Sequence, residues 1–285
     1  MKTNFHTHSL FCDGKDLPEE IVKKAIEKKF DILGFSSHSM FPFGADWHIS
    51  PYKFQEYTQE IQRLKESYKN EIQILLGFEV DYLSPLTFPK KEIYKEFSPD
   101  YLIGSVHYLT TDKGWFTVDG PVQELEYGLN DLFNGDGKKL VQEYFHTQRQ
   151  MLSNGEFDIL GHPDVIRKRN GVLHFFDETE SWYKSEIEET AKAIAQSGVI
   201  VEINTGGIAR GVISDTYPSL DFLKALNKYD VPITINSDAH NAQDLDCAFD
   251  FAKKQAAEAG YKEVTYLQRL NDKTEKRFIS INQFN

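Results

Sequence analysis

The chain has 285 residues, of which 40% are hydrophobic and 13% aromatic, and its 32 basic and 44 acidic side chains give a net charge of -12. This composition supports a substantial core and excludes disorder, while the negative charge argues against nucleic acid as the main partner, because a polyanion is repelled on average. Two cysteines provide no disulfide framework, and no apolar run reaches the length of a signal peptide or a membrane span, so we expect a cytoplasmic protein without a membrane partner.

Short apolar runs rich in β-branched and aromatic residues recur along the chain and predict strands that are buried on both faces. These runs lie near residues 2–6, 31–36, 72–79, 101–106, 157–161, 199–204 and 231–236. Amphipathic helical patterns lie between or after them, near residues 17–29, 51–68, 138–153, 179–197, 218–228 and 241–259. Asp16 is the expected cap of the first helix, and Ser50 followed by Pro51 is the expected start of the second.

This alternation predicts parallel strands joined by right-handed crossovers, in one α/β domain over residues 1–285. Seven such units could close as a barrel or lie open as a doubly wound sheet, and the pattern does not choose between the two. The longest insertion, roughly residues 108–137, is expected to form a loop over one rim. The chain contains no Pro/Gly/Ser-rich linker that would divide it into two domains.

Side chains able to bind metal ions lie at the carboxyl ends of these predicted strands, where parallel barrels and open α/β sheets build their active sites. In chain order they are His6, His8, Asp13, His38, Glu79, His107, His162, Asp238 and His240. His6 and His8 are two residues apart and would point the same way from a strand, so they could bind one ion. Asp238 and His240 repeat that spacing. Imidazole with carboxylate favours zinc, iron or manganese, and nine ligands could hold two or three ions with Glu79 as a bridge.

The order of these ligands resembles that of the polymerase-and-histidinol-phosphatase (PHP) superfamily over residues 4–240. Within it, the segments GSVHYL, WFTVDGP, GHPD and NTGGIARG resemble the histidinol-phosphatases of histidine biosynthesis. The resemblance implies a distorted seven-stranded (β/α) barrel, the PHP fold, with two or three ions of zinc, iron or manganese. It implies a first metal at His6, His8, Glu79 and Asp238, a second at Glu79, His107 and His162, and a third at Asp13, His38 and His240.

The expected reaction is hydrolysis of a phosphate monoester, L-histidinol phosphate, to L-histidinol and phosphate. A hydroxide bridging two metals would attack phosphorus in line, because the ions lower the pKa of bound water. Arg167 and Arg210 are the expected phosphate contacts, since a planar guanidinium suits phosphate and the resemblance places basic residues at both positions. Glu79, Asp238 and His240 complete the expected catalytic set. Either of the last two could protonate the leaving group, although metal ligation would compromise that role.

Two segments could select the substrate. Asp119 and Trp115, in the insertion, could bind a cationic amine or imidazole through charge and cation–π contact, and residues 40–50 could form another wall. A packed aromatic loop is the alternative interpretation of both segments, and surface charge is the alternative for Arg167 and Arg210.

Other functions stay open at this point. An amidohydrolase also begins with His-x-His on a barrel strand, but it commonly uses a bridging lysine where this chain has Glu79. A phosphoesterase of the same superfamily could act on another small phosphate ester or on oligonucleotide ends, which the net charge of -12 disfavours. A non-catalytic, metal-binding regulatory domain is the third alternative, and the full ligand set argues against it. The sequence does not indicate an oligomeric state.

Overall fold

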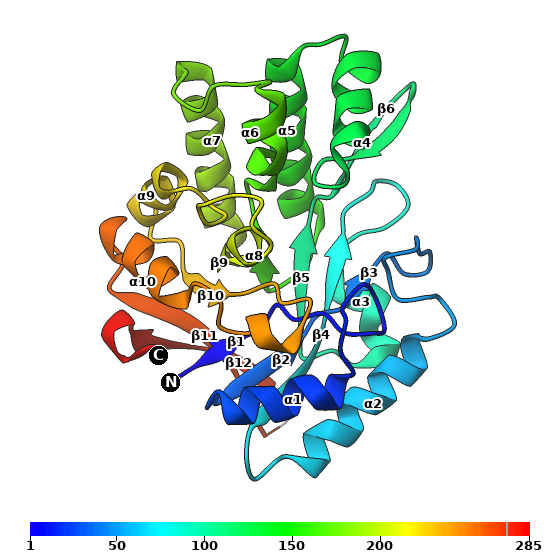
Figure 1. The fold of residues 1–285 in the computed structure, drawn as a ribbon, viewed down its shortest axis with the longest axis vertical. Helices are drawn as coiled ribbons and strands as arrows, with labels where there is room; N and C mark the ends of the chain where they lie inside the picture. The colour runs from blue at the N-terminus through cyan, green and yellow to red at the C-terminus, as the bar shows by residue number, and fades with distance from the viewer. Residues whose placement is uncertain (272) are drawn as a thin grey trace.

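Seven short parallel strands surround a common axis in the computed structural model, which describes residues 1–271 and 273–285 (Figure 1). Their order around the sheet is β1-β2-β4-β5-β8-β9-β10, and a short strand β3 (His38–Ser39) pairs with β4 in addition. The seven strands are β1 (Thr3–Asn4), β2 (Ile32–Phe35), β4 (Gln73–Asp81), β5 (Tyr101–Ser105), β8 (Ile159–Leu160), β9 (Ile200–Asn204) and β10 (Ile233–Asn236). All seven strands predicted from the sequence are therefore confirmed.

The sheet closes into a barrel between the segments that follow the first and the last of these strands. The backbone N–H of His8 donates to the carbonyl oxygen of Ala239 at 2.9 Å, and the N–H of Ala239 donates to the carbonyl oxygen of His6 at 3.2 Å. This closure confirms the predicted barrel and excludes the open doubly wound sheet. It also places His6 and His8 directly beside Asp238 and His240, although more than 200 residues separate them in the sequence.

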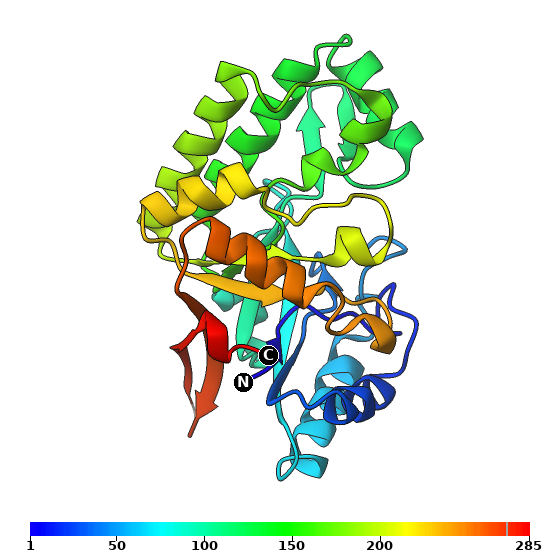
Figure 2. The same ribbon diagram turned by 60° about the vertical axis from the view of Figure 1, so that its left-hand side comes forward.

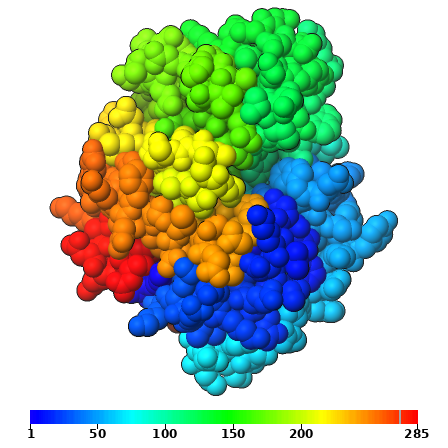
Figure 3. All heavy atoms as spheres, in the orientation of Figure 1, coloured from blue at the N-terminus to red at the C-terminus, as the bar shows by residue number. Residues whose placement is uncertain are grey.

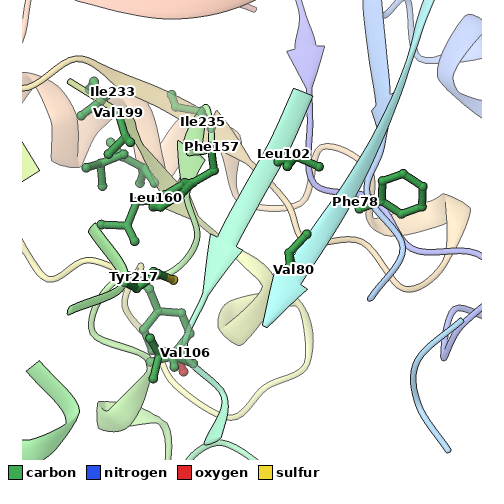
Figure 4. Packing of buried hydrophobic residues seen from close by; sticks show 14 of the residues in the cluster. Phe78, Val80, Leu102, Val106, Phe157, Leu160, Val199, Tyr217, Ile233 and Ile235 are labelled. Carbon is green, nitrogen blue, oxygen red and sulfur yellow. The ribbon is translucent and has the colours of Figure 1, made fainter. Parts of the chain in front are cut away.

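Helices cover the outside of the barrel, and α4 to α7 gather at the end of the molecule away from the two termini (Figures 1 and 2). The helices are α1 (Pro18–Glu27), α2 (Phe54–Ser67), α3 (Lys91–Tyr94), α4 (Val122–Tyr127), α5 (Gly137–Asn154), α6 (Asn170–Leu173), α7 (Ser181–Ser197), α8 (Gly206–Ala209), α9 (Leu220–Lys228) and α10 (Phe249–Glu258). Their apolar faces pack on the strands and form the main core, part of which Figure 4 shows. No helix among the described residues is long and apolar enough to cross a membrane.

The predicted helices are present, but their starting points differ from the predictions. Asp16 does not cap α1, because its carboxylate accepts the backbone N–H of Ala242 at 2.6 Å instead. The second helix begins at Phe54 rather than after Ser50, and the last predicted helix begins only at Phe249. The polar side chain of Asp16 is thus used to join the first and last βα segments, which lie side by side on the face shown in Figure 3.

The insertion at residues 108–137 is not the loop that was predicted. It contains an antiparallel hairpin, β6 (Tyr108–Thr111) and β7 (Gly114–Thr117), followed by α4 and a π-helical turn at Gly128–Leu132. Buried side chains such as Leu109 and Phe116 attach this hairpin to the core. The segment looked like a loop because its turn residues are close together, and only tertiary packing makes its short strands stable.

A second hairpin, β11 (Glu263–Leu270) and β12 (Lys273–Ser280), was not predicted from the sequence. Its Leu267 is buried in a small core that fills the inside of the barrel, together with Phe5, Ile32, Leu75, Tyr101, Ile103, Ile159 and Ile200. Several of these residues begin their strands, so the hairpin covers the amino-terminal end of the barrel. The opposite end stays open for the ligand-bearing loops.

Tyr101 fills the barrel interior, and its hydroxyl donates to the carbonyl oxygens of Phe5 at 2.5 Å and Phe35 at 3.0 Å. Two glycines make room for its ring. A Cβ at Gly77 would lie 2.5 Å from the Tyr101 ring, and a Cβ at Gly34 would lie 2.4 Å from the hydroxyl oxygen. These glycines are therefore required by close approach rather than by backbone conformation.

We expect the substitution Gly77→Ala to lower the free energy of unfolding by about 1–3 kcal/mol, because it overpacks the barrel interior. Chemical denaturation measures this change. Gly171→Ala in α6 is the control, since an added Cβ there meets nothing within 4 Å, and it should leave stability within about 0.5 kcal/mol of the native value. A Gly77→Ala protein as stable as this control would contradict the proposed packing.

Candidate metal centre

The structure brings all nine predicted ligands together at the carboxyl-terminal end of the barrel. They form four overlapping groups, in each of which the ligand atoms lie within 4.8 Å of one another. The groups are His8 with Asp13, His38 and His240; His6 with His8 and Asp238; His6 with Glu79 and His162; and His38 with Glu79 and His107. Such a shared, continuous cluster has the composition and the spacing of a site for more than one divalent ion.

Glu79, on β4, lies at the centre of this cluster and is fully buried. Its Oε2 atom is 3.0 Å from Nε2 of His6 and 2.8 Å from Nδ1 of His38, while its Oε1 atom is 2.9 Å from Nε2 of His162. The two carboxylate oxygens thus face imidazoles that come from different strands. This is the arrangement that a bridging carboxylate requires.

Several ligand atoms at this centre are buried and make no hydrogen bond of good geometry, although Oε2 of Glu79 lies within 3.0 Å of His6 and His38. They are Nε2 of His6, Nε2 of His8, Nδ1 of His38 and Oε2 of Glu79. Leaving a buried polar atom without a partner costs about 1–3 kcal/mol, so four of them facing one another call for a common partner. A divalent cation satisfies such lone pairs, and the mixture of imidazole and carboxylate suits zinc, iron or manganese. The residues therefore fit divalent metal ions.

Against the effect of burial, neighbouring carboxylates raise the pKa of His6, His38 and His107, that of His107 to about 10, whereas Glu79 and His8 have the protonation states of metal ligands. Burial opposes the ionised form of Glu79, but the imidazoles of His6, His38 and His107 hold its pKa well below the usual range. Burial, with the neighbouring imidazoles of His240 and His38, lowers the pKa of His8 to about 3, so its ring is neutral at pH 7. An ionised carboxylate and a neutral imidazole are the forms that bind metals.

Asp13 and His240 form the more exposed side of the cluster. Nε2 of His240 lies 3.1 Å from Oδ2 of Asp13, and the His240 ring stacks on His8 with 4.2 Å between ring centroids. Asp13 also lies 3.7 Å from Nε2 of His38. These two residues therefore line the entrance while Glu79 occupies the buried end.

A buried carboxylate that was not predicted, Glu202 on β9, supports two of the ligands. The Nδ1 atom of His6 is 2.8 Å from Oε2 of Glu202, and the backbone N–H of His162 donates to Oε1 at 2.8 Å. The side-chain amides of Asn204 and Asn236 donate to the same carboxylate at 2.8 and 2.9 Å. Four donors thus fix Glu202, which in turn orients His6. Its signal in the sequence is a glutamate in the middle of the apolar run VIVEIN.

A pocket of about 480 Å³ opens on the ligand cluster. Besides six of the nine ligands, its lining residues include Trp47, Thr117, Asp119, Glu124, Lys168 and Arg210. Arg210 is held at the pocket by Asp238, whose Oδ2 accepts from its Nη2 at 2.8 Å, and Nζ of Lys168 donates to Oδ2 of Asp119 at 2.9 Å. The pocket therefore combines two cations with carboxylates and an aromatic wall.

The structure does not bring Arg167 into this pocket. Its guanidinium is buried and bound to Asp164, Glu178 and Asp215 and to the carbonyl oxygen of Thr216. The next residue along the turn, Lys168, points into the pocket instead. The pocket is therefore lined by the cations Lys168 and Arg210 and not by Arg167.

Trp115 also lies outside the pocket, because 60% of its side chain is exposed on the β6–β7 hairpin. The aromatic wall is Trp47 instead, from the segment 40–50 that was expected to form a wall. Trp47 stacks on Tyr108, with 5.8 Å between ring centroids, and Trp115 makes an edge-to-face contact with the same tyrosine, with 5.5 Å between centroids. Asp119 lines the pocket.

Comparison with known proteins agrees with this geometry. The model of the PHP domain family matches residues 4–206. The chain is 26% identical over 288 residues to the histidinol-phosphatase of Lactococcus lactis, covering 96% of this chain and 98% of that protein. It is 23% identical over 267 residues to the histidinol-phosphatase of Bacillus subtilis, covering 87% and 97%. A crystal structure of the Lactococcus lactis histidinol phosphate phosphatase with zinc, L-histidinol and phosphate superposes with a TM-score of 0.72 at 24% identity, covering 96% and 98%.

We expect Glu79→Gln to weaken zinc binding by about 100-fold or more, because it removes both the charge and one acceptor oxygen at the centre of the cluster. Metal analysis after dialysis against a zinc buffer of fixed free concentration measures the loss. Glu258→Gln, at an exposed position near the end of α10, is the control and should keep the native metal content. If Glu79→Gln also kept its metal, Glu79 would not be a ligand.

Proposed function

The chain belongs to the PHP domain family, and we propose that it is a metal-dependent histidinol-phosphatase that hydrolyses L-histidinol phosphate to L-histidinol and phosphate. The observation that carries this proposal is the lining of the pocket, in which the ligand cluster adjoins two cations, Lys168 and Arg210, and two further carboxylates, Asp119 and Glu124. A phosphate monoester whose other end carries a positive charge matches both kinds of charge. Relatives named histidinol-phosphatase that align over nearly the whole chain support the same substrate and a role in histidine biosynthesis.

We propose that two or three ions of zinc, iron or manganese occupy the cluster. The first ion would be held by His6, His8 and Asp238 and the second by His107 and His162, and both would share Glu79. Asp13, His38 and His240 would hold the third ion. When bound, divalent ions supply a nucleophile at neutral pH and neutralise the charge of the phosphoryl group. The protein's own residues provide the orientation and the remaining charge.

Arg210 and Lys168 are the proposed phosphate contacts from the protein. Arg210 is fixed by two bonds to Asp238, from Nη2 to Oδ2 at 2.8 Å and from Nη1 to the backbone oxygen at 3.1 Å, so its guanidinium is oriented before substrate binds. Lys168 reaches the pocket from the turn after β8 and is paired with Asp119. Cations on two sides of a phosphoryl group would hold it in place and offset the charge that develops during transfer.

Asp119 and Glu124 are the proposed contacts for the ammonium and imidazole groups of L-histidinol. Asp119 is ionised, because Lys168 and His107 lower its pKa against the effect of burial. Trp47 would cover the imidazole from the side of the 40–50 segment. A pocket of about 480 Å³ has a suitable volume for a substrate of this size.

A panel of phosphate esters tests the proposed substrate. The zinc-loaded or manganese-loaded protein should release phosphate from L-histidinol phosphate with a kcat/KM at least about 100-fold higher than from glycerol phosphate or from a 5′-phosphorylated oligonucleotide, since neither of these offers a cation to the carboxylates. The measurement is the rate of phosphate release, with metal content determined on the same sample. Equal rates on all three esters would leave a phosphatase but remove the substrate assignment.

Asp119→Asn should lower kcat/KM for L-histidinol phosphate about tenfold, which corresponds to a loss of about 1.4 kcal/mol from one charge-assisted contact. The decrease should be much smaller for p-nitrophenyl phosphate, because that ester has no ammonium group. Asp250→Asn, at an exposed position on α10, is the control and should show native kinetics with both esters. Equal decreases with both esters would show that Asp119 acts on the phosphate end of the pocket through Lys168.

A further inference from the structure

A chain of buried hydrogen bonds leads from the metal ligand His107 to the wall of the pocket. Nδ1 of His107 lies 2.8 Å from Oδ1 of Asp81, and Oδ2 of Asp81 lies 2.7 Å from Nε2 of His48. Nδ1 of His48 accepts the backbone N–H of Ala45 at 3.1 Å. All three side chains in this chain are buried, with exposed fractions of 3% for His107, 1% for Asp81 and 4% for His48.

The hydrogen-bond partners of His48 and Asp81 fix the proton positions along this series of hydrogen bonds. Because a backbone N–H can only donate, Nδ1 of His48 carries the lone pair, and the ring proton of His48 is on Nε2 and donates to Asp81. The second oxygen of Asp81 then accepts the Nδ1–H of His107. This leaves the lone pair of His107 on Nε2, which lies 3.5 Å from Oε1 of Glu79 and so faces the ligand cluster.

His48 itself has no free nitrogen with which to bind a metal or to transfer a proton. Both of its ring nitrogens already have partners inside the protein, Ala45 and Asp81. It is also absent from the four groups of ligand atoms that the described residues form. Its ring also packs on that of Trp47, with 3.8 Å between ring centroids.

The residues beside His48 form the pocket wall. The ring of Trp47 packs against the edges of His38 and His107, with ring centroids 4.6 and 5.3 Å apart. The backbone N–H of Ile49 donates to the carbonyl oxygen of His38 at 3.0 Å. The segment Trp47–Ile49 therefore contacts both His38 and His107 directly. It is also linked to His107 through the hydrogen bonds of His48 and Asp81.

We propose that His48 is a positioning residue that acts through Asp81 to fix the tautomer and orientation of His107, and that it thereby couples metal binding to the position of the Trp47 wall. This inference rests on the proposed metal-dependent function. Mutation of a residue that hydrogen-bonds to a metal ligand commonly changes metal affinity 10- to 100-fold. Here that residue is Asp81, and it is hydrogen-bonded in turn to His48, which adjoins Trp47 in the wall of the pocket. By thermodynamic linkage, holding Trp47 in its position should raise the affinity for the metal, and metal binding should stabilise Trp47 in that position.

Two substitutions of His48 separate its two hydrogen bonds. A glutamine can place its side-chain amide near the position of Nε2 and donate to Asp81, whereas an asparagine can place its oxygen near Nδ1 and accept only from Ala45. Asp81→Asn removes the central acceptor. His146→Asn is the matched control, because His146 is exposed on α5, where its ring contacts Gln150.

Competition between the protein and a chromophoric chelator for zinc measures metal affinity without any substrate. We expect Asp81→Asn to weaken the most sensitive zinc site 10- to 100-fold and His48→Asn to weaken it about tenfold. His48→Gln and His146→Asn should stay within about threefold of the native affinity. Native affinity in His48→Asn, or equal losses in the asparagine and glutamine variants, would overturn the proposal.

Thermal unfolding of the zinc-free proteins separates positioning from folding. All four variants should unfold within a few degrees of the native protein without zinc, and the stabilisation that added zinc provides should be smaller for Asp81→Asn and His48→Asn. If His48→Asn does not fold, the comparison of Asp81→Asn with His48→Gln decides, and equal zinc affinity in that pair would also overturn the proposal.

Kinetics with L-histidinol phosphate test the coupling to the wall. With zinc saturating, His48→Asn should raise KM several-fold with a smaller effect on kcat, because the Trp47 wall is displaced while the metal is present, and His48→Gln should restore KM. An unchanged KM would disprove the coupling. If the native protein does not hydrolyse this ester, the proposed function fails, and the zinc titration still tests the role of His48 independently.

Discussion

The burial of one charged carboxylate, that of Glu79, is the constraint on which the rest of the structure depends. An ion removed from water costs several kcal/mol unless its surroundings compensate it. The compensation comes from the hydroxyl of Ser105, which donates to Oε1 at 2.7 Å, and from imidazoles that follow several different strands. Those imidazoles can meet only if the strands close into a barrel. Closure at Ala239 and the chemistry of the centre are therefore two aspects of one requirement.

The period of the β-strand extends this arrangement outward. Glu79 and Asp81 are two residues apart on β4, and Glu202 and Asn204 are two residues apart on β9. In each pair the side chains point to the same face, so β4 supplies both a ligand at the centre and a carboxylate behind it, and β9 supplies a supporting carboxylate and an amide that holds it. His6 and His107 consequently have one ring nitrogen toward the cluster and the other on a buried carboxylate. The metal ligands are thus oriented by the same strands that carry them.

The sequence was sufficient to predict the seven strands and the grouping of nine side chains, because the apolar runs are followed by histidines and carboxylates. The barrel was expected from the family resemblance. The sequence was not sufficient for features that depend on tertiary packing. The hairpin β6–β7 is stabilised by the burial of Phe116, and the hairpin β11–β12 by the insertion of Leu267 into the barrel. The position of Trp115 outside the pocket lining has the same origin, since a hairpin side chain can face either the pocket or the solvent.

Arg167 shows most clearly why position along the chain does not determine function. It lies in the short 3₁₀ turn Val165–Arg169, where successive side chains point in different directions, so Lys168 enters the pocket while Arg167 turns away. A buried guanidinium requires compensation, and Asp164, Glu178 and Asp215 provide it from three separate segments. Asp215 belongs to the segment that follows α8 and Arg210. Arg167 therefore joins the turn that carries one pocket cation, Lys168, to the loop that follows the other, Arg210.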